Sequence, residues 1–411
     1  MKNEGKIECL INDLERTTED IFSFEELKNK LMTKEKLVIK YGVDVTAPFL
    51  HLGHAVNLWM MRRLQEEGHK VIFLIGDTTT KIGDPTGKSQ TRPIIADVEI
   101  QENTTKYIRQ VSNILITDEP SVFEVRRNSE WYDKLELSHF ISLLSYVTHS
   151  RLISRNMFQK RIEEGREIYT HELVYPILQG YDSVMLESDL TIVGSDQLFN
   201  ENIGRFFQAK FNQDPQVIIT SKITPGLDGK EKQSKSLGNY VAIADNSKDK
   251  FGKVMSLPDE LITQWMEVYT DISLDKIKSY EKKLKNQSIN PRNLKLELAE
   301  AIVEKYHNLE IAKQEKDWFI NIFSKRDFPE DAPIIQIKKG EYTIIEILKK
   351  SLPTKSNSEL RRLIQQGGFK LNNEKIIDPF VKTTVRSQEI YYIRVGKRNF
   401  FKLLASGDRR K

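Results

Sequence analysis

The sequence has 411 residues, of which 39% are hydrophobic and 30% are charged, with 20 glycines and 13 prolines. At about 150 residues per domain, this length predicts two or three domains and excludes a single small binding module. The composition is globular and excludes a disordered, collagen-like or low-complexity chain. Cys9 is the single cysteine, which excludes an internal disulfide framework and a Cys-rich zinc site and favours a reducing compartment.

The N-terminus and the hydropathy pattern bear on location. The first residues, MKNEGKIECLINDLERTTED, carry acidic side chains where a signal peptide needs an apolar core. No stretch approaches the roughly 18 consecutive apolar residues that a membrane-spanning helix requires. We therefore expect a soluble, cytoplasmic protein without a membrane partner.

The net charge of +4 is an average over two unlike parts. Residues 341–411 contain 16 Lys and Arg against 7 Asp and Glu, a net of +9, which leaves −5 for residues 1–340. A folded basic module favours a polyanion partner, and nucleic acid more often than a membrane. A tail that only improves solubility remains the alternative at this point.

The first half of the chain alternates apolar runs of strand length with longer amphipathic segments, which predicts an α/β fold with a parallel sheet over residues 1–243. The predicted strands are Lys36–Val43, Val71–Gly76 and Leu190–Val193. The predicted helices are Gly53–Glu67 and Val174–Leu186, and helical patterns at Asp97–Ile116 and Ser138–Glu164 form a central insertion, about 97–165.

The second half changes character at residue 244. Residues 244–327 carry helical patterns without strand signals, for example Asn293–Lys305, and predict an all-helical domain. Mixed charge and two prolines predict a linker at 328–340. Residues 341–411 predict a small α+β domain with helices at Thr343–Lys350 and Asn357–Gln366, followed by short β-like runs over Phe369–Leu404.

The segment HLGH, residues 51–54, follows a predicted strand and opens a predicted helix. The first N–H groups of a helix and its positive dipole end attract phosphate. Gly53 would let a flat adenine lie against the backbone, and His51 and His54 can donate hydrogen bonds to phosphate oxygens. Taken alone, the two histidines fit zinc ligands or surface residues equally well.

A second segment, KQSKSLGN at residues 232–239, follows the α/β part. Lys232 and Lys235 can neutralise the charge that develops on a triphosphate as it is cleaved, although a Lys/Ser loop on its own is usually solvated surface. Together, HLGH and KQSKS in this order on an α/β frame resemble the HIGH and KMSKS signatures of class I aminoacyl-tRNA synthetases.

Four further segments resemble bacterial tyrosyl-tRNA synthetases, and the likeness covers most of residues 36–245. The segments are GVDVTA at 42–47, GDPTGK at 83–88, YPILQGYD at 175–182 and GSDQ at 194–197. The chain is identified as a member of that family. This implies a tyrosine–tRNA ligase that activates L-tyrosine with ATP to tyrosyl-adenylate and transfers tyrosine to the 3′ end of tRNA(Tyr), on a Rossmann-like catalytic domain.

The tyrosine pocket is the most specific part of this resemblance. Tyr175, Gln179 and Asp182 have spacings of four and three, so one helix face can present all of them to a small ligand. The resemblance implies that Asp84, Tyr175 and Gln179 hold the amino group of tyrosine and that Asp182 accepts a hydrogen bond from its phenol. Phenylalanine would leave that acceptor unpaired, and tyrosyl-tRNA synthetases are the known example of such rejection.

The resemblance implies the remaining site residues as well. The tyrosine site also takes Gly42 and Gln197; the ATP site takes Asp44, Gly53, His54, Gly194, Asp196 and Lys235, with Gly42 also beside the nucleotide; and the catalytic set is His51, His54, Thr46, Lys88, Arg92, Lys232 and Lys235. Asn128 matches an asparagine that supports the aspartate at position 84. Mg²⁺ would arrive with ATP, without protein metal ligands.

The basic module resembles the RNA-binding fold shared with a ribosomal small-subunit protein, S-four, on the segment NSELRRLIQQGGFKLNNEKIID at residues 357–378. Arg361, Arg362, Lys370 and Lys375 would contact phosphates, which gives affinity without sequence choice. The helical domain would take part in anticodon binding, and the family implies a homodimer with its interface at the insertion.

The sequence also departs from the family. Lys40 stands where the best-known bacterial forms have a tyrosine that binds the substrate phenol, Val45 replaces a proline, and Gln233 replaces the methionine of KMSKS. Three alternatives stay open: a tryptophanyl enzyme, an RNA-binding scaffold without activity, and a paralogue with altered amino-acid specificity or a biosynthetic or resistance role.

Overall fold

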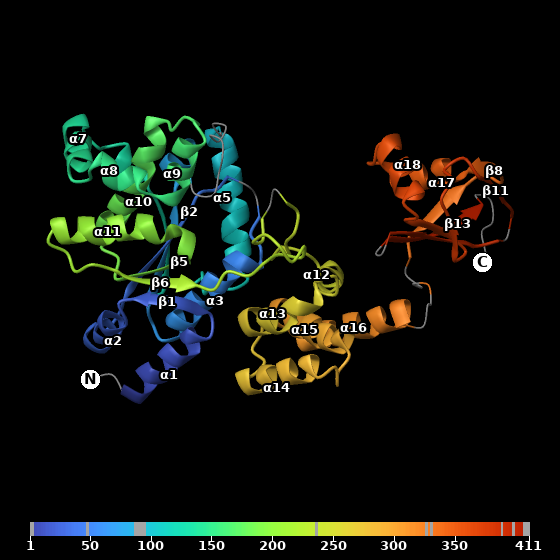
Figure 1. The fold of residues 1–411 in the computed structure, drawn as a ribbon, viewed down its shortest axis with the longest axis horizontal. Coiled ribbons are helices and arrows are strands. Elements are labelled where there is room, and N and C mark those ends of the chain that lie inside the picture. The colour runs from blue at the N-terminus through green and yellow to red at the C-terminus, as the bar shows by residue number, and fades with distance from the viewer. Residues whose placement is uncertain are drawn as a thin grey trace. The chain divides into compact units, whose positions relative to one another are not determined.

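The computed structural model describes residues 4–46, 49–85, 96–234, 237–324, 328, 332–387, 389–396 and 399–405. The chain divides into two compact units, Met1–Ala312 and Lys313–Lys411, each with its own sheet (Figure 1). Within the described residues, no helix has the length and apolar character needed to cross a membrane.

The first unit is built on a six-stranded sheet with the order β1-β6-β5-β2-β3-β4. Its strands are β1 (Thr18–Phe22), β2 (Val38–Val43), β3 (Lys70–Ile75), β4 (Phe123–Arg127), β5 (Leu190–Gly194) and β6 (Val217–Ser221). Only β1 runs antiparallel to its neighbour, and the other pairs are parallel. The predicted α/β fold with a parallel sheet is confirmed.

Helices cover this sheet because its central strands are apolar on both faces. Ile72 and Leu74 of β3 belong to one buried cluster with residues of α10 (Thr170–Met185) and α11 (Leu198–Lys210). Side chains alternate along a strand, so the intervening residues of β3 face the opposite layer. There α3 (Leu52–Glu66) contacts β3 and β5.

The remaining helices of this part of the chain lie before, between and after the strands. They are α1 (Glu4–Glu15), α2 (Phe24–Thr33), α4 (Asp77–Ile82), α5 (Asp97–Val111), α6 (Ser129–Tyr132), α7 (Leu137–Ser145), α8 (His149–Ile153), α9 (Asn156–Glu163), η1 (Ser195–Gln197), α12 (Ser247–Val254), η2 (Asp259–Leu261), α13 (Ile262–Tyr269), α14 (Leu274–Lys285), α15 (Pro291–Tyr306) and α16 (Leu309–Ser324).

The strand order predicts a ligand site at the carboxyl ends of β2 and β5. From β2 the chain proceeds outward through β3 and β4, and then returns to β5 and proceeds outward on the other side to β6. Crossover connections therefore leave these two neighbouring strands in opposite directions. In open α/β sheets, ligands bind at the carboxyl ends of such strands.

The structure differs from the predictions in several elements. The helical pattern at Ser138–Glu164 is divided into α7, α8 and α9, and the helix that begins at Asp97 ends at Val111 rather than Ile116. The strands β1, β4 and β6 were not predicted. The predicted helical domain, 244–327, lies mostly in the first unit, because α12 and α13 pack against α15 and α13 contacts α3.

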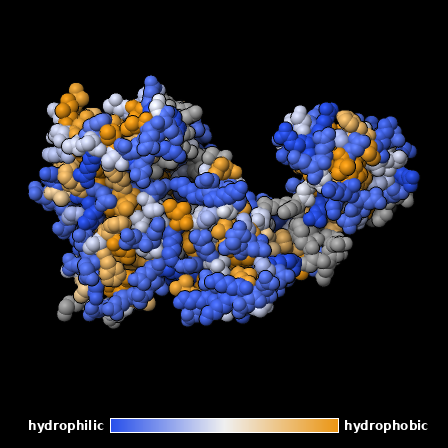
Figure 2. All heavy atoms as spheres, viewed as in Figure 1, coloured by the Kyte–Doolittle hydropathy of each residue, from blue (hydrophilic) through white to orange (hydrophobic). Residues whose placement is uncertain are grey.

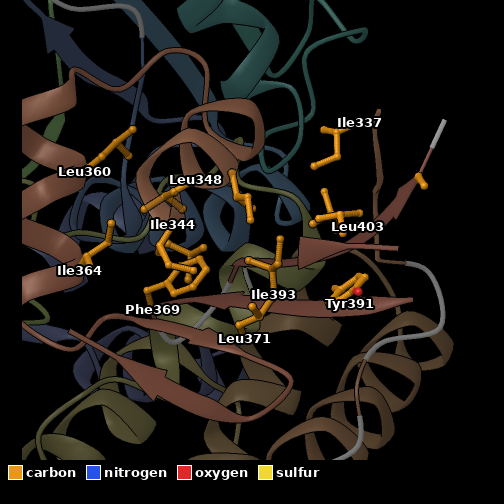
Figure 3. Packing of buried hydrophobic residues seen from close by; sticks show 14 residues of the cluster. Ile337, Ile344, Leu348, Leu360, Ile364, Phe369, Leu371, Tyr391, Ile393 and Leu403 are labelled. Atoms are coloured by element: carbon orange, nitrogen blue, oxygen red, sulfur yellow. The ribbon is translucent and has the colours of Figure 1, made fainter. Parts of the chain in front are cut away.

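The second unit has a five-stranded sheet, β10-β9-β12-β13-β7, and a two-stranded sheet, β11-β8. Its elements are β7 (Ile334–Ile337), β8 (Gly340–Thr343), α17 (Ile344–Ser351), α18 (Asn357–Gln365), β9 (Phe369–Leu371), β10 (Glu374–Ile376), β11 (Lys382–Val385), β12 (Tyr391–Val395) and β13 (Asn399–Ala405). Figure 3 shows how the apolar faces of α17 and α18 pack on the sheet. The second unit thus has a hydrophobic core of its own.

The boundary of this unit also differs from the prediction. The linker was predicted at 328–340, but Ile334–Ile337 forms β7, which pairs in parallel with β13. Any linker is therefore shorter than predicted, and the folded unit begins before residue 341.

Candidate active site

The predicted site residues gather at the carboxyl ends of the parallel strands. Asp44 directly follows β2, Asn128 directly follows β4, and the segment Gly194–Gln197 ends β5 and forms η1. Since β2 and β5 are the neighbours between which the chain direction reverses, these residues surround the ligand site that the topology predicts.

His51 and His54 cap the first turn of α3 with each other's help. The Nδ1 atom of His51 accepts a hydrogen bond from the N–H of Gly53 at 3.2 Å, and the Nδ1 atom of His54 accepts one from the N–H of His51 at 3.3 Å. A ring nitrogen that accepts carries no proton, so each neutral imidazole carries its proton on Nε2. The cap therefore fixes both rings as Nε2–H donors.

Gly53 leaves room for the His51 ring. A Cβ atom at position 53 would lie 3.0 Å from Cε1 of His51, so the ring would have to shift by a few tenths of an ångström. The start of α3 is also where the first N–H groups and the helix dipole favour an anion. The first signature thus combines a helix N-terminus with two oriented donors.

The segment that follows the second signature contacts the first signature. His51 forms an isolated bridge with Ala242, and the N–H of Leu52 donates to the carbonyl of Val241 at 3.0 Å. The segment 241–243 continues directly from the KQSKSLGN loop. The structure therefore brings the chain that carries the lysines to the start of α3.

The described part of the second signature is anchored by polar contacts. Nζ of Lys232 forms an ion pair with Asp196 at 2.7 Å, although its side chain is 53% exposed. Gln233 is buried and donates to the hydroxyl of Tyr269 at 2.8 Å. Asn239 accepts from the N–H of Ser234 at 2.8 Å and so closes the loop. Lys235 lies outside the described residues, as do Lys88 and Arg92.

Tyr175 and Asp44 connect the two predicted subsites. The buried hydroxyl of Tyr175 donates to Oδ2 of Asp44 at 3.0 Å, and Thr79 donates to Oδ1 of the same carboxylate at 3.0 Å. Burial, with the nearby carboxylates of Asp44 and Asp84, raises the pKa of Tyr175 well above its usual value. Tyr175 is therefore a neutral donor that lies between the residues predicted for tyrosine and for ATP.

Asp182 is a buried carboxylate, 4% exposed, with donors around one oxygen. Its Oδ1 accepts from the indole N–H of Trp131 at 3.1 Å and from the hydroxyl of Tyr132 at 2.8 Å. Its Oδ2 has one long bond, 3.5 Å, to the amide of Asn128, which leaves it the capacity to accept another donor. Burial raises the pKa of Asp182 to about 7, against the lowering effects of Lys40 and the three donors.

Gln179, Gln197 and Asp84 belong to one chain of hydrogen bonds. The amide of Asn200 donates to Oε1 of Gln179 at 2.7 Å and to Oε1 of Gln197 at 3.1 Å. Gln197 in turn donates to Oδ2 of Asp84 at 2.7 Å. Three predicted tyrosine ligands are thus linked through Asn200, which sequence analysis did not identify.

The smaller predicted residues lie at, or just after, the carboxyl ends of β2 and β5. Gly42, at the end of β2, is exposed, and the N–H of Thr46 donates to the carbonyl of Asp44 at 2.9 Å. A Cβ atom at Gly194 would lie 2.7 Å from Oδ1 of Asp196, so a side chain there would displace that carboxylate.

The role expected for Asn128 is wrong. Its amide does not support Asp84. Instead its carbonyl accepts from the N–H of Thr78 at 2.9 Å, and its NH₂ group donates to Thr79 and Asp182. The reason is its position as the N-cap of α6, a helix that contacts α4, which in turn contacts α10.

Sequence analysis also missed Arg155. This side chain is buried, and the carboxylates of Asp84 and Asp196 act on its pKa, which burial nevertheless lowers. Arg155 therefore adds a cation close to the predicted tyrosine and ribose ligands. It is the N-cap residue of α9, just after α8, where the sequence carries no local motif.

The predicted RNA-binding residues lie in the second unit. Arg361 and Arg362 are exposed on α18. Lys370 of β9 is the cross-strand partner of Lys375 on β10 and of Arg394 on β12. Cross-strand partners project from the same face, so these three residues form a basic stripe across three strands. Arg394 was not predicted, and its alignment with Lys370 depends on strand pairing.

The sequence is similar to those of known proteins. The sequence model of the family described as tRNA synthetases class I (W and Y) matches residues 32–324. The tyrosine–tRNA ligase of Thermotoga maritima is 41% identical over 398 residues, which cover 97% of this chain and 98% of that protein. The tyrosine–tRNA ligase of Aquifex aeolicus is 41% identical over 388 residues, which cover 94% and 96%.

Solved structures share the fold. A C-terminally truncated mitochondrial tyrosyl-tRNA synthetase of Aspergillus nidulans has a TM-score of 0.60 at 20% identity and covers 79% of this chain and 95% of that one. Tyrosyl-tRNA synthetase of Archaeoglobus fulgidus, complexed with L-tyrosine, has a TM-score of 0.59 at 20% identity and covers 76% and 100%. With the family match over most of its length and these close relatives in sequence, the chain belongs to the class I tRNA synthetases of the tryptophan and tyrosine type.

Proposed function

We propose that this chain is a tyrosine–tRNA ligase, which activates L-tyrosine with ATP and transfers it to tRNA(Tyr). The observation that carries the choice of tyrosine is Asp182, a buried carboxylate with one oxygen able to accept a further donor. A phenol supplies such a donor, whereas phenylalanine does not. The 41% identity to curated tyrosine–tRNA ligases over nearly the whole chain supports the same choice.

The substrate tyrosine would lie along α10. Its phenol would donate to Asp182, and its ammonium group would be held by Asp84, Tyr175 and Gln179, with Gly42 and Gln197 beside it. Hydrogen bonds link Gln179 through Asn200 and Gln197 to Asp84. They support this placement, because they hold the acceptors Gln179 and Asp84 in fixed orientations.

ATP would occupy the ligand site beside α3, with Asp44, Gly53, Gly194 and Asp196 around the nucleoside. The tyrosine carboxylate attacks the α-phosphorus in line and expels pyrophosphate, so no protein nucleophile is needed. Catalysis then consists of holding the reactants together and stabilising negative charge on phosphate oxygens. We assign that charge stabilisation to His51, His54, Thr46, Lys88, Arg92, Lys232 and Lys235.

Mg²⁺ would enter with ATP. Among the described residues there is no group of three His, Cys, Asp or Glu side chains arranged to hold a metal ion. A cation shared with the phosphates fits this chain, because Mg²⁺ usually keeps several waters and binds substrate phosphates. In the second step a ribose hydroxyl at the 3′ end of tRNA attacks the carbonyl carbon of the adenylate and expels AMP, whose phosphate takes the hydroxyl proton. We place this reaction in the cytoplasm, where tRNA is used.

Pyrophosphate exchange across a panel of amino acids tests this function. We expect exchange into ATP with tyrosine, none with phenylalanine or tryptophan, and charging of tRNA(Tyr). Exchange with another amino acid but not with tyrosine would identify a paralogue of altered specificity. The absence of exchange with every amino acid, together with RNA binding, would identify a scaffold without activity.

The second unit is proposed to bind tRNA with an S-four-like domain, and the helices within 244–327 to take part in anticodon binding. The basic stripe of Lys370, Lys375 and Arg394 supports RNA as the partner, because like charges on facing strands destabilise a sheet. A phosphate backbone would neutralise them. Arg361 and Arg362 would add contacts from α18.

The double substitution Lys370→Ala and Lys375→Ala is expected to weaken tRNA binding equally for all tRNA sequences. The slope of log K against log salt should fall by about 2, because each lysine neutralises one phosphate. Filter binding over a series of salt concentrations measures this, and tyrosine-dependent exchange should not change. Lys382→Ala is the matched control, because Lys382 is exposed but paired with Glu341 at 2.8 Å. An unchanged slope in the double variant would remove the stripe from the interface.

A homodimer is proposed through the insertion, 97–165. The helix α7 is strongly apolar, yet Leu143 is its one buried residue, and Leu137 and Ile141 are 72% and 57% exposed. Figure 2 shows hydrophobic side chains at the place where Figure 1 labels α7. Exposed apolar groups of this kind mark an interaction surface, and a second copy is the occupant that the family implies.

The substitution Ile141→Asp is expected to convert the dimer to a monomer at micromolar concentration, since it would place a charge in an apolar interface. Sedimentation equilibrium measures the mass. Leu274→Asp on α14, also at an exposed apolar position, is the control and should leave the mass unchanged. A wild-type monomer, or an Ile141→Asp dimer, would contradict this interface.

A further inference from the structure

Lys40 and Glu201 form a buried ion pair under the candidate tyrosine pocket. Nζ of Lys40 lies 2.8 Å from Oε2 of Glu201, and both side chains are 2% exposed. Lys40 also donates to the hydroxyl of Ser183 at 2.7 Å, and Gln216 donates to Oε2 of Glu201 at 2.7 Å. The charge of Lys40, the residue that departs from the family at position 40, is therefore neutralised by the carboxylate of Glu201 on α11.

Such a pair is a weak source of stability. The loss of hydration of two ions offsets most of their attraction, and apolar replacements of similar volume are often as stable. Removal of one partner alone is costly, because it leaves an uncompensated buried charge. The pair also lies close enough to Asp182 for the charge of Lys40 to lower the pKa of that carboxyl, which connects it with the ligand site.

Glu201 determines which end of the Gln179 amide faces which neighbour. Oε1 of Glu201 accepts from Nε2 of Gln179 at 2.8 Å. An ionised carboxylate only accepts hydrogen bonds, so the NH₂ end of the amide must face Glu201 and the carbonyl must face away. Flipping the amide would oppose two oxygens.

The carbonyl of Gln179 is consequently an acceptor fixed in place. Oε1 takes one hydrogen bond from Asn200, at 2.7 Å, and a carbonyl oxygen can accept two. A second acceptance suits a cationic donor such as an ammonium group. The same Asn200 amide links onward to Gln197 and Asp84.

We propose that the Lys40–Glu201 pair is a positioning device for the substrate's ammonium group, because it locks Gln179 with its carbonyl as the acceptor. Lys40 and Glu201 are positioning residues and do not touch the substrate. The inference depends on the tyrosine-binding role proposed for Gln179. It explains why a lysine at position 40 comes with a glutamate at position 201.

Glu201→Gln is the most direct test, because the glutamine side chain has nearly the same shape but permits the Gln179 amide to flip. We expect the KM for tyrosine in pyrophosphate exchange to rise roughly 10- to 150-fold, the size of a lost hydrogen bond to a charged group. The KM for ATP should change by less than about twofold.

A variant of both partners separates positioning from stability. Lys40→Met alone should lower the melting temperature, and adding Glu201→Met should restore part of the loss. No unpaired charge then remains, although the NH₂ groups of Gln179 and Gln216 lose their acceptor. The KM for tyrosine should stay high in the double variant, because Gln179 then has no carboxylate to hold its NH₂ group. If stability and tyrosine KM recovered together, the pair would have only a structural role.

Lys30→Met supplies the matched control. Lys30 forms another buried ion pair, with Asp189 at 3.4 Å, before β5 at the opposite end of the sheet. Asp189 also pairs with Lys34 at 2.5 Å, so it keeps one cation when Lys30 is removed. The loss of Lys30 should lower the melting temperature and leave the KM for tyrosine unchanged. A Glu201→Gln enzyme with the wild-type tyrosine KM would overturn the positioning role. A wild-type enzyme that does not use tyrosine would instead refute the proposed function.

Discussion

Replacing Asp182 with asparagine is expected to lower kcat/KM for tyrosine in pyrophosphate exchange by about 10²- to 10⁴-fold. A charge-assisted hydrogen bond to the phenol contributes about 1.5–3 kcal/mol, and a misplaced buried donor costs about 1–3 kcal/mol more. The same substitution should change kcat/KM for phenylalanine far less. The preference for tyrosine would therefore shrink by a similar factor.

The surroundings of Asp182 explain why an amide of equal size fails. Trp131 and Tyr132 donate to Oδ1, and Asn128 donates to Oδ2. If the NH₂ group of the new asparagine took the place of Oδ1, it would face two donors. If it took the place of Oδ2, it would face the Asn128 amide and could not accept from the phenol. An Asp182→Asn enzyme that kept its preference for tyrosine over phenylalanine would remove Asp182 from phenol recognition.

The ionisation of Asp182 should also determine how kcat/KM for tyrosine depends on pH in the wild-type enzyme. Because the pKa of Asp182 is raised to about 7, a large fraction is protonated at pH 6 and is a poorer acceptor for the phenol. We expect kcat/KM for tyrosine to rise with pH through about 7, since this parameter reports the free enzyme. Glu and Asp side chains of ordinary pKa would not titrate in that range.

The pH dependence of the free energy of unfolding gives an independent measurement of the pKa of Asp182. Burial raises the pKa of Asp182 from its ordinary value of 3.8 to about 7, so the folded state binds more protons than the unfolded state between these values. Its contribution is present below pH about 4 and is lost as pH rises through about 7. The free energy of unfolding of wild type, relative to Asp182→Asn, should therefore fall between pH 5 and 8. A pH-independent difference would contradict the raised pKa.

Local patterns predicted the parts of the site that a single element carries. Tyr175, Gln179 and Asp182 were placed together from helical spacing, and all three lie on α10. The helices α17 and α18 were predicted to within one residue at each end. In the structure their N-termini are held by capping boxes, Thr343 with Glu346 and Ser356 with Glu359.

The parts of the site and fold that were not predicted depend on contacts between residues far apart in the sequence, which leave no local pattern. Trp131 and Tyr132 reach Asp182 from α6, about 50 positions earlier in the chain. The strand β7 became part of a sheet only through β13, and β1 only through β6. Glu201 could have been found, because it stands one helical turn after Gln197 and an acidic partner was needed for an apolar-flanked Lys40.

The start of α3 yields the second large effect. His54→Asn is expected to reduce pyrophosphate exchange at saturating tyrosine by about 10²- to 10³-fold, the usual cost of removing one donor to a developing oxyanion. Asparagine keeps an oxygen near the place of Nδ1, so it can still accept from the N–H of His51 and preserve the cap. It has no group at the position of Nε2–H.

His54→Gln is the complementary variant and separates the catalytic role of His54 from its capping role. Its NH₂ group reaches the region of Nε2, but it provides no short acceptor for the N–H of His51. We expect it to keep more exchange activity than His54→Asn while losing about 1 kcal/mol of stability, the typical value of a cap. Thermal denaturation and exchange rates together measure the two effects. If the asparagine variant were the more active one, the Nε2–H donor would have no part in catalysis and capping would be the only role of His54.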